Sequence, residues 1–566
     1  GPDAGGSVFR AERTTYNADG QVIVAERGTV TNQSSNPWAS FASLWRAETG
    51  YDFIGNRVRE TLVGGGAARA VTQYSYDAAG RLECTAARMN TATFAALPAS
   101  ACTLTLVAAG LGPDRVARAT YDNANRATKL TVGFGSVLAV DEWTRTYSAN
   151  GAVASLADAG GNLTTYVYDG FDRLSRIRFP NASGGGSSTT DYENYSYDVG
   201  SNVTVDRRRD ASTLTQSYDN LSRVTLVGAS SNGADISSSY DLFGRLLTQS
   251  AGGQTLSFAY DQLSRNLSQT SSVLGAVSYQ YDLASRRTRM TWPDGFYVSY
   301  DVNLYDEVTA IRENGAASGA GVLATYVYDN LGRRTSLTRG NGTSETLGYD
   351  AAFTLSSLAQ NLSGTSFDQT LSFARNPLAQ LSARTGSNAA YQWTPQAPGT
   401  TSYSDNALNQ YTSVGGASPS YDARGNLTGD GSRTYAFDIF NRLTSVSGAG
   451  AMSLGYDPAG RLYETVASGV TTRFLYDGDE IIAEYNGSNA LQRRYVHGAG
   501  FDEHLVWYEG AGASDRRYLV QDDLGSVIAN DNGGSVTAYA YDEYGLPSSW
   551  TGPRFRYSGA MALPEA

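Results

Sequence analysis

Residues 197–286 repeat one short phrase at a spacing of about 21 residues. In chain order its copies read Tyr197-Asp198-Val199-Gly200-Ser201-Asn202, Tyr218-Asp219-Asn220-Leu221-Ser222-Arg223, Tyr240-Asp241-Leu242-Phe243-Gly244-Arg245, Tyr260-Asp261-Gln262-Leu263-Ser264-Arg265 and Tyr281-Asp282-Leu283-Ala284-Ser285-Arg286. Outside this run the phrase returns as Tyr51-Asp52-Phe53-Ile54-Gly55-Asn56, Tyr76-Asp77-Ala78-Ala79-Gly80-Arg81, Tyr168-Asp169-Gly170-Phe171-Asp172-Arg173, Tyr328-Asp329-Asn330-Leu331-Gly332-Arg333, Tyr421-Asp422-Ala423-Arg424-Gly425-Asn426, Tyr456-Asp457-Pro458-Ala459-Gly460-Arg461 and Tyr541-Asp542-Glu543-Tyr544-Gly545. A short tandem repeat indicates a fold that grows by adding one small unit.

The phrase has the chemistry of a hairpin turn. Aspartate is favoured at the first position of a type I turn, where its carboxylate accepts from backbone N–H groups further along, and glycine three residues later supplies the positive φ of a bulged hairpin. Ser222, Ser264 and Asp172 stand in the glycine position. We expect a strained or altered turn at these three sites, because only glycine adopts positive φ freely.

The residues on either side of the turn are expected to face one another. Tyrosine precedes the turn and arginine or asparagine follows it, so the two would lie nearly opposite across the hairpin. Such pairs contribute about 0.2–1 kcal/mol, and a guanidinium over the ring adds a cation–π contact. Since about 21 residues make two strands of roughly seven with two turns, the sequence predicts one hairpin per repeat and a structural role for the motif residues.

Tandem hairpins over 566 residues predict a long curled wall. Roughly 27 hairpins would give on the order of 50 strands and, at ~4.8 Å per strand, a ribbon about 240 Å long. Strand twist coils such a ribbon, and a single turn of it would be about 75 Å across, which is too wide for side chains to fill. The predicted fold is all-β, with tandem β-hairpin repeats in a spiralling, hollow, barrel-like or cocoon-like shell whose closure is left open.

Composition fits an all-β chain and excludes several classes of protein. Tyrosine, with 38 residues against 18 phenylalanines, suits strands whose faces are half wet. The net charge of −12 argues against a nucleic acid as partner. No apolar stretch approaches the roughly 20 residues that span a bilayer, so a soluble chain is expected. Cys84 and Cys102 either pair, which would contribute roughly 3 kcal/mol, or are two free buried thiols.

Residues for catalysis or metal binding are sparse. His497 and His504 flank a glycine-rich loop, and two histidines are too few for a zinc site, so we interpret them as surface loop residues. Carboxylates that could form a general-acid pair are Asp522 with Asp523, and Asp477 with Asp479 and Glu480. Aspartate occurs at almost every turn, so such pairs arise by accident. We expect no catalytic residue, no metal and no cofactor, and a hydrolase is a third hypothesis only.

The motif Tyr-Asp-x-x-Gly-Arg-Leu resembles the RHS/YD-repeat family. This family includes bacterial polymorphic toxins, the C component of insecticidal Tc toxin complexes and the extracellular teneurins. Longer phrases that look like bacterial RHS proteins lie in residues 80–102, 409–416 and 518–527. The resemblance covers nearly the whole chain, and it implies a shell that encapsulates a C-terminal toxin or effector domain.

The sequence and the resemblance together divide the chain into three parts. Residues 1–2 look like the scar of a cleaved tag, residues 3–516 correspond to the YD-repeat β-shell, and residues 517–566 correspond to the start of an RHS-associated core domain that stops before the self-cleavage site and the toxin. The leading hypothesis is therefore a non-catalytic encapsulating shell of a secreted or cell-surface bacterial toxin. Its cargo would be the missing C-terminal effector domain, with secretion-system or immunity proteins as further partners. The alternative is a cell-surface adhesin, a YD-repeat scaffold that binds glycans or proteins.

Two stretches lack the Tyr-Asp pair, residues 351–420 and residues 486–515. Both are interpreted as divergent hairpins or loops, and the first as either a degenerate repeat or an insertion into the lumen. Little helix is expected, and residues 88–101 are the best candidate for a short one.

Overall fold

The structure is a computed structural model that describes residues 8–33, 36–107, 110–394, 399–547 and 549–563. The expected tag scar at residues 1–2 lies outside these ranges. The described residues form strands β1 to β45 and six short 3-10 turns, and none of them lies in an α-helix. No helix in this part of the chain has the length and apolar character needed to cross a membrane.

The first sheet has 30 strands, each paired antiparallel with its neighbours in chain order. Its strands are β1 Phe9–Tyr16, β2 Val22–Val30, β3 Ala42–Tyr51, β4 Arg57–Gly64, β5 Ala67–Tyr76, β6 Leu82–Ala87, β7 Arg115–Tyr121, β8 Ala127–Val132, β9 Val140–Tyr147, β10 Val153–Asp158, β11 Leu163–Tyr168, β12 Leu174–Pro180, β13 Ser187–Tyr197, β14 Val203–Arg207, β15 Thr213–Tyr218, β16 Val224–Ala229, β17 Ile236–Tyr240, β18 Leu246–Ala251, β19 Gln254–Tyr260, β20 Asn266–Ser271, β21 Gly275–Tyr281, β22 Arg287–Thr291, β23 Tyr297–Val302, β24 Val308–Glu313, β25 Val322–Tyr328, β26 Arg334–Arg339, β27 Ser344–Tyr349, β28 Leu355–Asn361, β29 Gln369–Arg375 and β30 Leu381–Gly386.

A separate hairpin and a second sheet of 13 strands follow. The hairpin is β31 Tyr403–Asp405 and β32 Tyr411–Val414, and the second sheet is β33 Ser420–Tyr421, β34 Leu427–Gly429, β35 Thr434–Phe437, β36 Leu443–Ser447, β37 Met452–Tyr456, β38 Leu462–Ala467, β39 Val470–Asp477, β40 Glu480–Asn486, β41 Leu491–His497, β42 His504–Glu509, β43 Arg516–Gln521, β44 Val527–Asp531 and β45 Val536–Ala538. The 3-10 turns are Pro37–Ser40, Thr91–Thr93, Gly319–Gly321, Thr365–Phe367, Ala389–Tyr391 and Tyr557–Gly559.

The repeat tyrosines end odd-numbered strands throughout the first sheet, as Tyr76 ends β5 and Tyr240 ends β17. Because the strands alternate in direction, turns that follow odd strands all lie at one edge of the wall. We call this edge the YD rim, and its turns in the first sheet begin at Asp52, Asp77, Asp122, Asp169, Asp198, Asp219, Asp241, Asp261, Asp282, Asp329 and Asp350.

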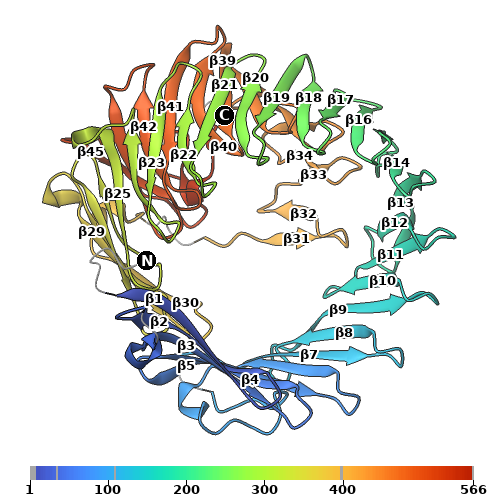
Figure 1. Cartoon of the computed structure of the whole chain (residues 1–566). Helices are drawn as coiled ribbons and strands as arrows, with labels where there is room; N and C mark the ends of the chain where they lie inside the picture. Colours follow the sequence, from blue (N-terminus) through green and yellow to red (C-terminus); the bar gives the residue numbers. More distant parts are fainter. Residues whose placement is uncertain (1–7, 34–35, 108–109, 395–398, 548, 564–566) are drawn as a thin grey trace.

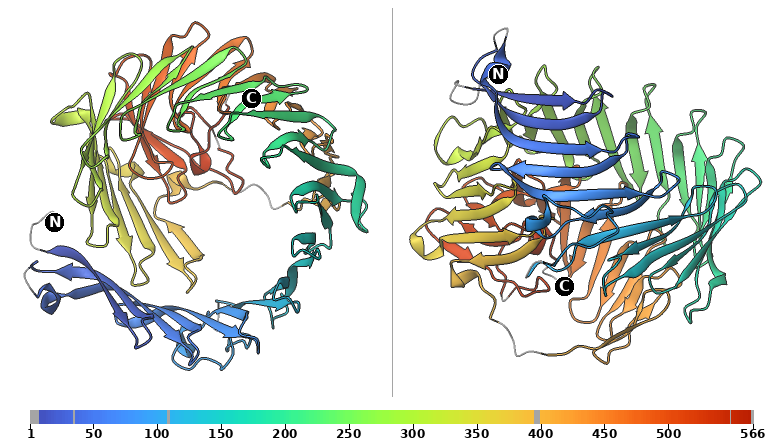
Figure 2. Two further views of the ribbon diagram at one scale, coloured as in Figure 1. Left: turned by 45° about the vertical axis from the view of Figure 1, so that its right-hand side comes forward. Right: turned by 90° about the horizontal axis from the view of Figure 1, so that it is seen from below.

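The first sheet curls through nearly a full turn around an open centre (Figures 1 and 2). Its first strand comes back against its later part, because Arg10 of β1 forms an ion pair of 2.6 Å with Glu307 and donates to the Asp329 carbonyl at 2.7 Å. Among the described residues β1 and β30 form no ladder with one another, so the shell spirals without closing. This all-β spiral of hairpins is the predicted fold.

The expectation of a single continuous wall is wrong, because the ladder breaks after β30 and the second sheet packs against the first. A shared core joins Val277, Ile311 and Leu323 of the first sheet to Ile482 and Val506 of the second. Their apolar faces are removed from water by this contact, which a single-layered wall does not offer. The wall is therefore two sheets thick where β21 to β26 lie beside β38 to β43 (Figure 1).

The stretch 351–420 contains divergent strands of the first sheet and a separate hairpin. Strands β28 to β30 continue the first sheet, whereas hairpin β31–β32 lies inside the ring in Figure 1 and at one end of the shell in Figure 2. Its turn reaches the opposite wall, where the Ala407 amide donates to the Ala182 carbonyl at 3.2 Å. The stretch 486–515 forms the paired strands β41 and β42, and residues 88–101 contain a single 3-10 turn in place of the expected helix.

Candidate functional site: the repeat junctions and the wall

Each YD turn is organised by its aspartate, as the turn of Asp77 shows. The Asp77 amide donates to the Arg81 carbonyl at 2.9 Å, and the Gly80 amide donates back to the Asp77 carbonyl at 2.9 Å. The Asp77 carboxylate accepts from the amides of Ala79 and Arg81 and from the Arg81 side chain at 2.7 Å. The side-chain hydrogen bond from Arg81 is the largest cause that lowers the pKa of Asp77. The carboxylate thus stays ionised and satisfies the donors of a tight turn.

Turns without glycine keep the same form. Ser222, Ser264 and Asp172 take φ values of 59°, 64° and 59°, beside 77° at Gly80. Their amides still donate to the carbonyl of the turn aspartate, at 3.0 to 3.1 Å. The three residues therefore adopt the left-handed backbone conformation, which is strained for a residue with a side chain. The hydrogen bonding of the turn is not altered.

Where a turn ends in arginine and the next odd-numbered strand ends in tyrosine, the arginine lies over that tyrosine and not over the tyrosine of its own hairpin. Arg286, whose next odd-numbered strand ends at Val302, donates to the Asn303 carbonyl at 2.7 Å. The guanidinium of Arg81 lies 4.7 Å from the ring centre of Tyr121 and donates to the Asp122 carbonyl at 3.0 Å. The Tyr121 hydroxyl donates to the Leu82 carbonyl at 2.7 Å. Tyr76 stands opposite Leu82 in the ladder, so the expected contact across one hairpin is replaced by a contact between hairpins.

We call this set of contacts the repeat junction. The arginine stands over the tyrosine of the following hairpin in the pairs Arg126–Tyr147, Arg173–Tyr197, Arg223–Tyr240, Arg245–Tyr260, Arg265–Tyr281, Arg333–Tyr349, Arg442–Tyr456 and Arg461–Tyr476. A tyrosine hydroxyl donates to a carbonyl of the preceding hairpin at Tyr51, Tyr76, Tyr168, Tyr218, Tyr328 and Tyr541. The turns at Asp422–Gly425, Asp457–Gly460 and Asp542–Gly545 repeat the geometry in and after the second sheet. The motif residues therefore join neighbouring hairpins along the YD rim.

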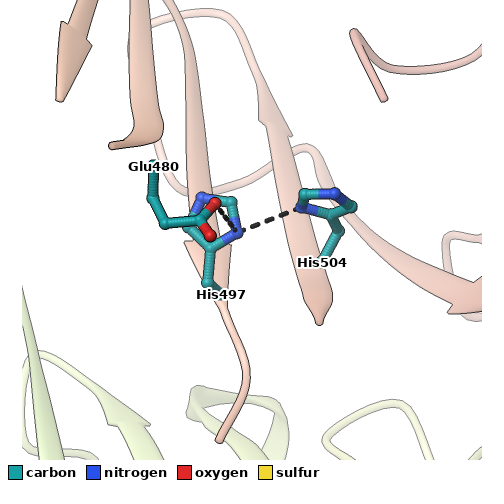
Figure 3. Close-up of side chains that lie close together, drawn as sticks. All are labelled: Glu480, His497 and His504. Atoms are coloured by element: carbon teal, nitrogen blue, oxygen red, sulfur yellow. Dashed lines mark hydrogen bonds and ion pairs between the residues drawn. The ribbon is translucent and has the colours of Figure 1, made fainter. Parts of the chain in front are cut away.

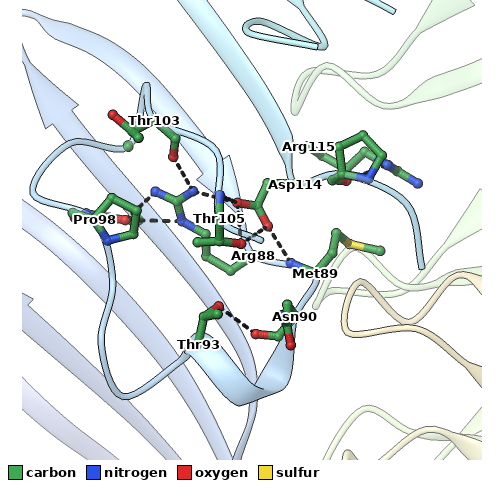
Figure 4. A network of polar contacts seen from close by, with 12 residues as sticks. Arg88, Met89, Asn90, Thr93, Pro98, Thr103, Thr105, Asp114 and Arg115 are labelled. Atoms are coloured by element: carbon green, nitrogen blue, oxygen red, sulfur yellow. Dashed lines mark hydrogen bonds and ion pairs between the residues drawn. The ribbon is translucent and has the colours of Figure 1, made fainter. Parts of the chain in front are cut away.

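A disulfide and a buried ion pair stabilise the long connection between β6 and β7. Cys84 and Cys102 are joined, with 5.3 Å between their Cα atoms. In the same connection Arg88, which is fully buried, contacts Asp114 at 2.7 Å and donates to the Thr103 carbonyl at 2.7 Å (Figure 4). Burial raises the pKa of Asp114, but hydrogen bonds from Met89, Thr105 and Arg88 outweigh it, so the pKa is lowered overall. All these contacts lie within the connection or join it to β6, which indicates a structural role.

The two histidines do not lie on a surface loop. His497 at the end of β41 stands opposite His504 at the start of β42 in the antiparallel ladder. The His504 residue is only 3% exposed. The two Nδ1 atoms are 3.1 Å apart, and the Glu480 carboxylate lies 3.6 Å from His497 Nδ1 (Figure 3). Phe555 stacks on the His504 ring at 3.7 Å. Burial, followed by the charge of His497, lowers the pKa of His504 to about 3. The sequence contains one indication of this contact that the surface-loop interpretation overlooked. Both histidines flank the same short loop, so they become cross-strand neighbours when the two strands pair.

Of the carboxylates considered for general-acid chemistry, Asp522, Asp523 and Asp477 are ion-paired with arginines, and Glu480 lies beside His497. Arg384 contacts Asp522 at 2.9 Å and Asp523 at 2.8 Å. Burial is the largest cause that raises the pKa of Asp522. Asp477 is bonded to Arg287 at 2.6 Å and to the Tyr279 hydroxyl at 2.8 Å. These aspartates therefore serve as links to the first sheet.

Known proteins resemble this chain in sequence and in fold. Residues 147–183 match the family model described as RHS Repeat. The tRNA3(Ser)-specific nuclease WapA of Bacillus spizizenii is 30% identical over 172 residues, which is 28% of this chain and 7% of that protein. The tRNA nuclease WapA of Bacillus subtilis is 29% identical over 172 residues, again 28% of this chain and 7% of that protein. The chain therefore spans a small part of these relatives.

Solved structures of Tc toxins share the fold. The crystal structure of TcdB2-TccC3 superposes with a TM-score of 0.60 at 14% identity, over 99% of this chain and 34% of that chain. The Tc holotoxin pore of Photorhabdus luminescens gives a TM-score of 0.58 at 13% identity, over 98% of this chain and 33% of that chain.

Fold and junctions together define a class, that of spiral β-shells built from tandem Tyr-Asp hairpins. The chain carries an RHS repeat at residues 147–183, and in sequence and fold it is similar to RHS/YD-repeat proteins.

Proposed function

We propose that this chain is the non-catalytic wall of a bacterial toxin, secreted or carried at the cell surface, that encloses its own C-terminal effector domain. The observation that carries this proposal is the 30-stranded meander, which curls nearly a full turn around an open centre. We assign residues 3–516 to the shell and residues 517–566 to the start of the RHS-associated core domain. The proposal is supported by the sequence similarity to the WapA nucleases and by the fold shared with TcdB2-TccC3.

The dimensions of the ring fit a small folded cargo. Thirty strands about 4.8 Å apart make an arc of about 140 Å, which closes to a ring about 45 Å wide. Side chains on the inner face reach about 5 Å inward, so about 35 Å remains. A compact domain of about 100 residues, with a radius of gyration near 13 Å, is about 34 Å across. Such a domain would fill the ring where the wall is one sheet thick.

Protease protection of a fused domain tests the enclosure. A small reporter domain placed after Ala566 is expected to be digested more than about tenfold more slowly than the free reporter, because the wall blocks access to it. The same reporter placed before Gly1 is the control and should be digested at the rate of the free domain. Equal digestion rates at the two ends would rule out enclosure by this wall.

A second function, protein binding by the YD rim, is favoured by exposed apolar side chains. The turns that follow odd-numbered strands from β11 to β23, at the edge of the YD rim, present Phe171, Val199, Leu221, Leu242, Phe243, Leu263, Leu283 and Leu304, each more than half exposed. A continuous apolar row of this kind is typical of a protein contact surface. Many of the repeat tyrosines, such as Tyr240, Tyr260 and Tyr281, are covered by arginines, which does not fit glycan binding by exposed tyrosine faces. Replacing Leu242 and Phe243 by serine should abolish partner capture under this function and leave reporter protection unchanged.

A further inference from the structure

The described residues contain one group of three side chains with the ligand types of a transition-metal site, Glu480, His497 and His504. Their ligand atoms all lie within 4.8 Å of one another. The residues come from the start of β40, the end of β41 and the start of β42, so three neighbouring strands deliver one ligand each. The group stands apart from the YD turns and their junctions.

Backbone carbonyls fix the protonation of both rings. His497 Nε2 lies 2.8 Å from the Ile481 carbonyl oxygen, and His504 Nε2 lies 3.1 Å from that of Gly559. A carbonyl oxygen can only accept, so each Nε2 carries the proton and donates it. When both rings are neutral, the other nitrogen of each is an unprotonated acceptor, so both Nδ1 lone pairs are available to a ligand.

The two free lone pairs face one another. The Nδ1 atoms are 3.1 Å apart, and each ring is held in place, His504 by stacking on Phe555. Two acceptors at this distance repel unless a proton or a cation lies between them. Two imidazole nitrogens bonded to one tetrahedral zinc ion at 2.0–2.1 Å lie about 3.3 Å apart. The observed separation is close to that value.

The remaining features of the group are those of built metal sites. Histidine ligands usually donate their other N–H to a backbone carbonyl or carboxylate, as both rings do here. The Glu480 carboxylate lies 3.6 Å from His497 Nδ1 and is partly open to solvent, which gives an ion a route of entry. Two imidazoles with one carboxylate are a donor set suited to zinc, with a position left for water.

We propose that Glu480, His497 and His504 form a binding site for a divalent transition-metal ion of the zinc class. The ion would join β40, β41 and β42. Through the Gly559 carbonyl and Phe555 it would also hold the segment after β45 against the second sheet.

Metal titration of the whole chain tests the site. The chain is stripped with a chelator and titrated with Zn²⁺ by calorimetry, and with Co²⁺ by visible absorption. We expect one ion per chain, micromolar or tighter affinity, and the intense d–d bands of tetrahedral cobalt. His497→Gln and Glu480→Gln should each weaken binding by more than about tenfold, since even losing an outer-shell partner costs about 10–100-fold.

Glu509→Gln is the matched control, because Glu509 ends β42 and contacts Arg493 at 3.0 Å, apart from the histidines. It should bind zinc as the unmodified chain does. His504→Gln is avoided as the main variant because His504 is buried and the change can disturb folding. A chain that stays unsaturated at millimolar Zn²⁺, or a His497→Gln variant that binds like the unmodified chain, would overturn the proposal.

Discussion

At the scale of residues, one aspartate, one arginine and one tyrosine recur in the same bonded arrangement. The aspartate closes its own turn, while the arginine and tyrosine join that turn to the next hairpin. The turn was predictable, because aspartate and glycine at this spacing have local conformational preferences. The ring that the arginine contacts was not predictable. A β-bulge at the tyrosine shifts the register of the hairpin, so the arginine does not stand opposite the tyrosine of its own turn.

Removing one tyrosine hydroxyl tests whether the repeat junction stabilises neighbouring hairpins. The Tyr328 hydroxyl donates to the Val308 carbonyl at 2.9 Å, and burial is the largest cause that raises the pKa of Tyr328. Tyr328→Phe leaves that carbonyl without its donor and should cost about 1 kcal/mol. Native-state hydrogen exchange should become roughly fivefold faster in β24 and β25.

The control is Tyr544→Phe, because Tyr544 is 79% exposed. Its exchange rates should match those of the unmodified chain. If Tyr328→Phe also exchanged at the original rates, the hydroxyl would contribute nothing to the junction.

The contribution of the buried Arg88–Asp114 ion pair to the stability of the fold should depend on pH. The pKa of Asp114 in the folded chain lies below its usual 3.8, so the ionised form stabilises the fold above about pH 4, and this stability is lost as the pH falls through the lowered pKa. Asp114→Asn leaves the Arg88 charge buried without a counter-ion, which should cost about 3–5 kcal/mol at pH 7. Thermal unfolding from pH 7 to pH 2 should show the gap between variant and unmodified chain shrinking below pH 4. A gap of constant size would contradict this account.

At the scale of elements, the hairpin was predictable and its exceptions were not. The connection between β6 and β7 folds around Arg88, and nothing local in the sequence identifies the carbonyls that surround this side chain. His497 and His504 meet because β41 and β42 pair around a tight loop, and this pairing could have been predicted from their spacing.

Loss of the disulfide should weaken the connection between β6 and β7. Cys84 and Cys102 are 18 residues apart, and a crosslink over such a loop contributes roughly 3 kcal/mol by restricting the unfolded chain. Replacing both by serine should lower the denaturation midpoint, measured by the fluorescence change in urea. Adding a reductant to the unmodified chain should give the same shift, and a reductant without effect would contradict the assignment.

Hairpin β31–β32 is held to the opposite wall by few contacts. Asn409 donates to Asp158 at 3.2 Å and accepts from Asn162 at 3.3 Å, at a φ of 57° that glycine also adopts. Asn409→Gly should keep the turn and release the hairpin, seen as faster proteolysis within residues 399–420. Ser285→Gly, at φ 66° in a turn of the first sheet, is the control and should leave proteolysis unchanged.

At the scale of the whole molecule, the spiral was predictable from the repeat, and the second layer was not. Strand twist and edge protection explain why a long meander curls. The contact of Trp292 with the Ile482 carbonyl at 3.1 Å joins residues 190 positions apart, and no periodicity in the sequence indicates such a pairing.

The link between the first strand and the later wall should control how tightly the spiral is wound. Arg10→Ala removes the ion pair with Glu307 and the hydrogen bond to Asp329, and charge-assisted bonds of this kind contribute about 1.5–3 kcal/mol. Hydrogen exchange in β1 should accelerate by more than about tenfold. Arg27→Ala removes an exposed pair with Glu12 and a cation–π contact with Trp45 but no contact with the later wall, so it should not change exchange in β1. An unchanged β1 in the Arg10 variant would show that the strand is held by other contacts.

The radius of gyration gives an independent test of the open-centred spiral. A compact chain of 566 residues would have a radius of gyration of about 24 Å, and an open-centred spiral must exceed it. Solution scattering of the purified chain should give the larger value together with a central minimum in density. A value at or below the compact one would rule out the ring.

The repeat junction has a consequence for how such chains diversify. Each arginine reaches only the hairpin that follows it, so no contact of the junction depends on how many units precede or follow. Deleting or duplicating one unit of about 21 residues leaves the chemistry of every remaining boundary intact. Unequal recombination between the repeats of one gene can therefore change the circumference of the wall by whole hairpins. Such a change requires no new side-chain contact between repeats.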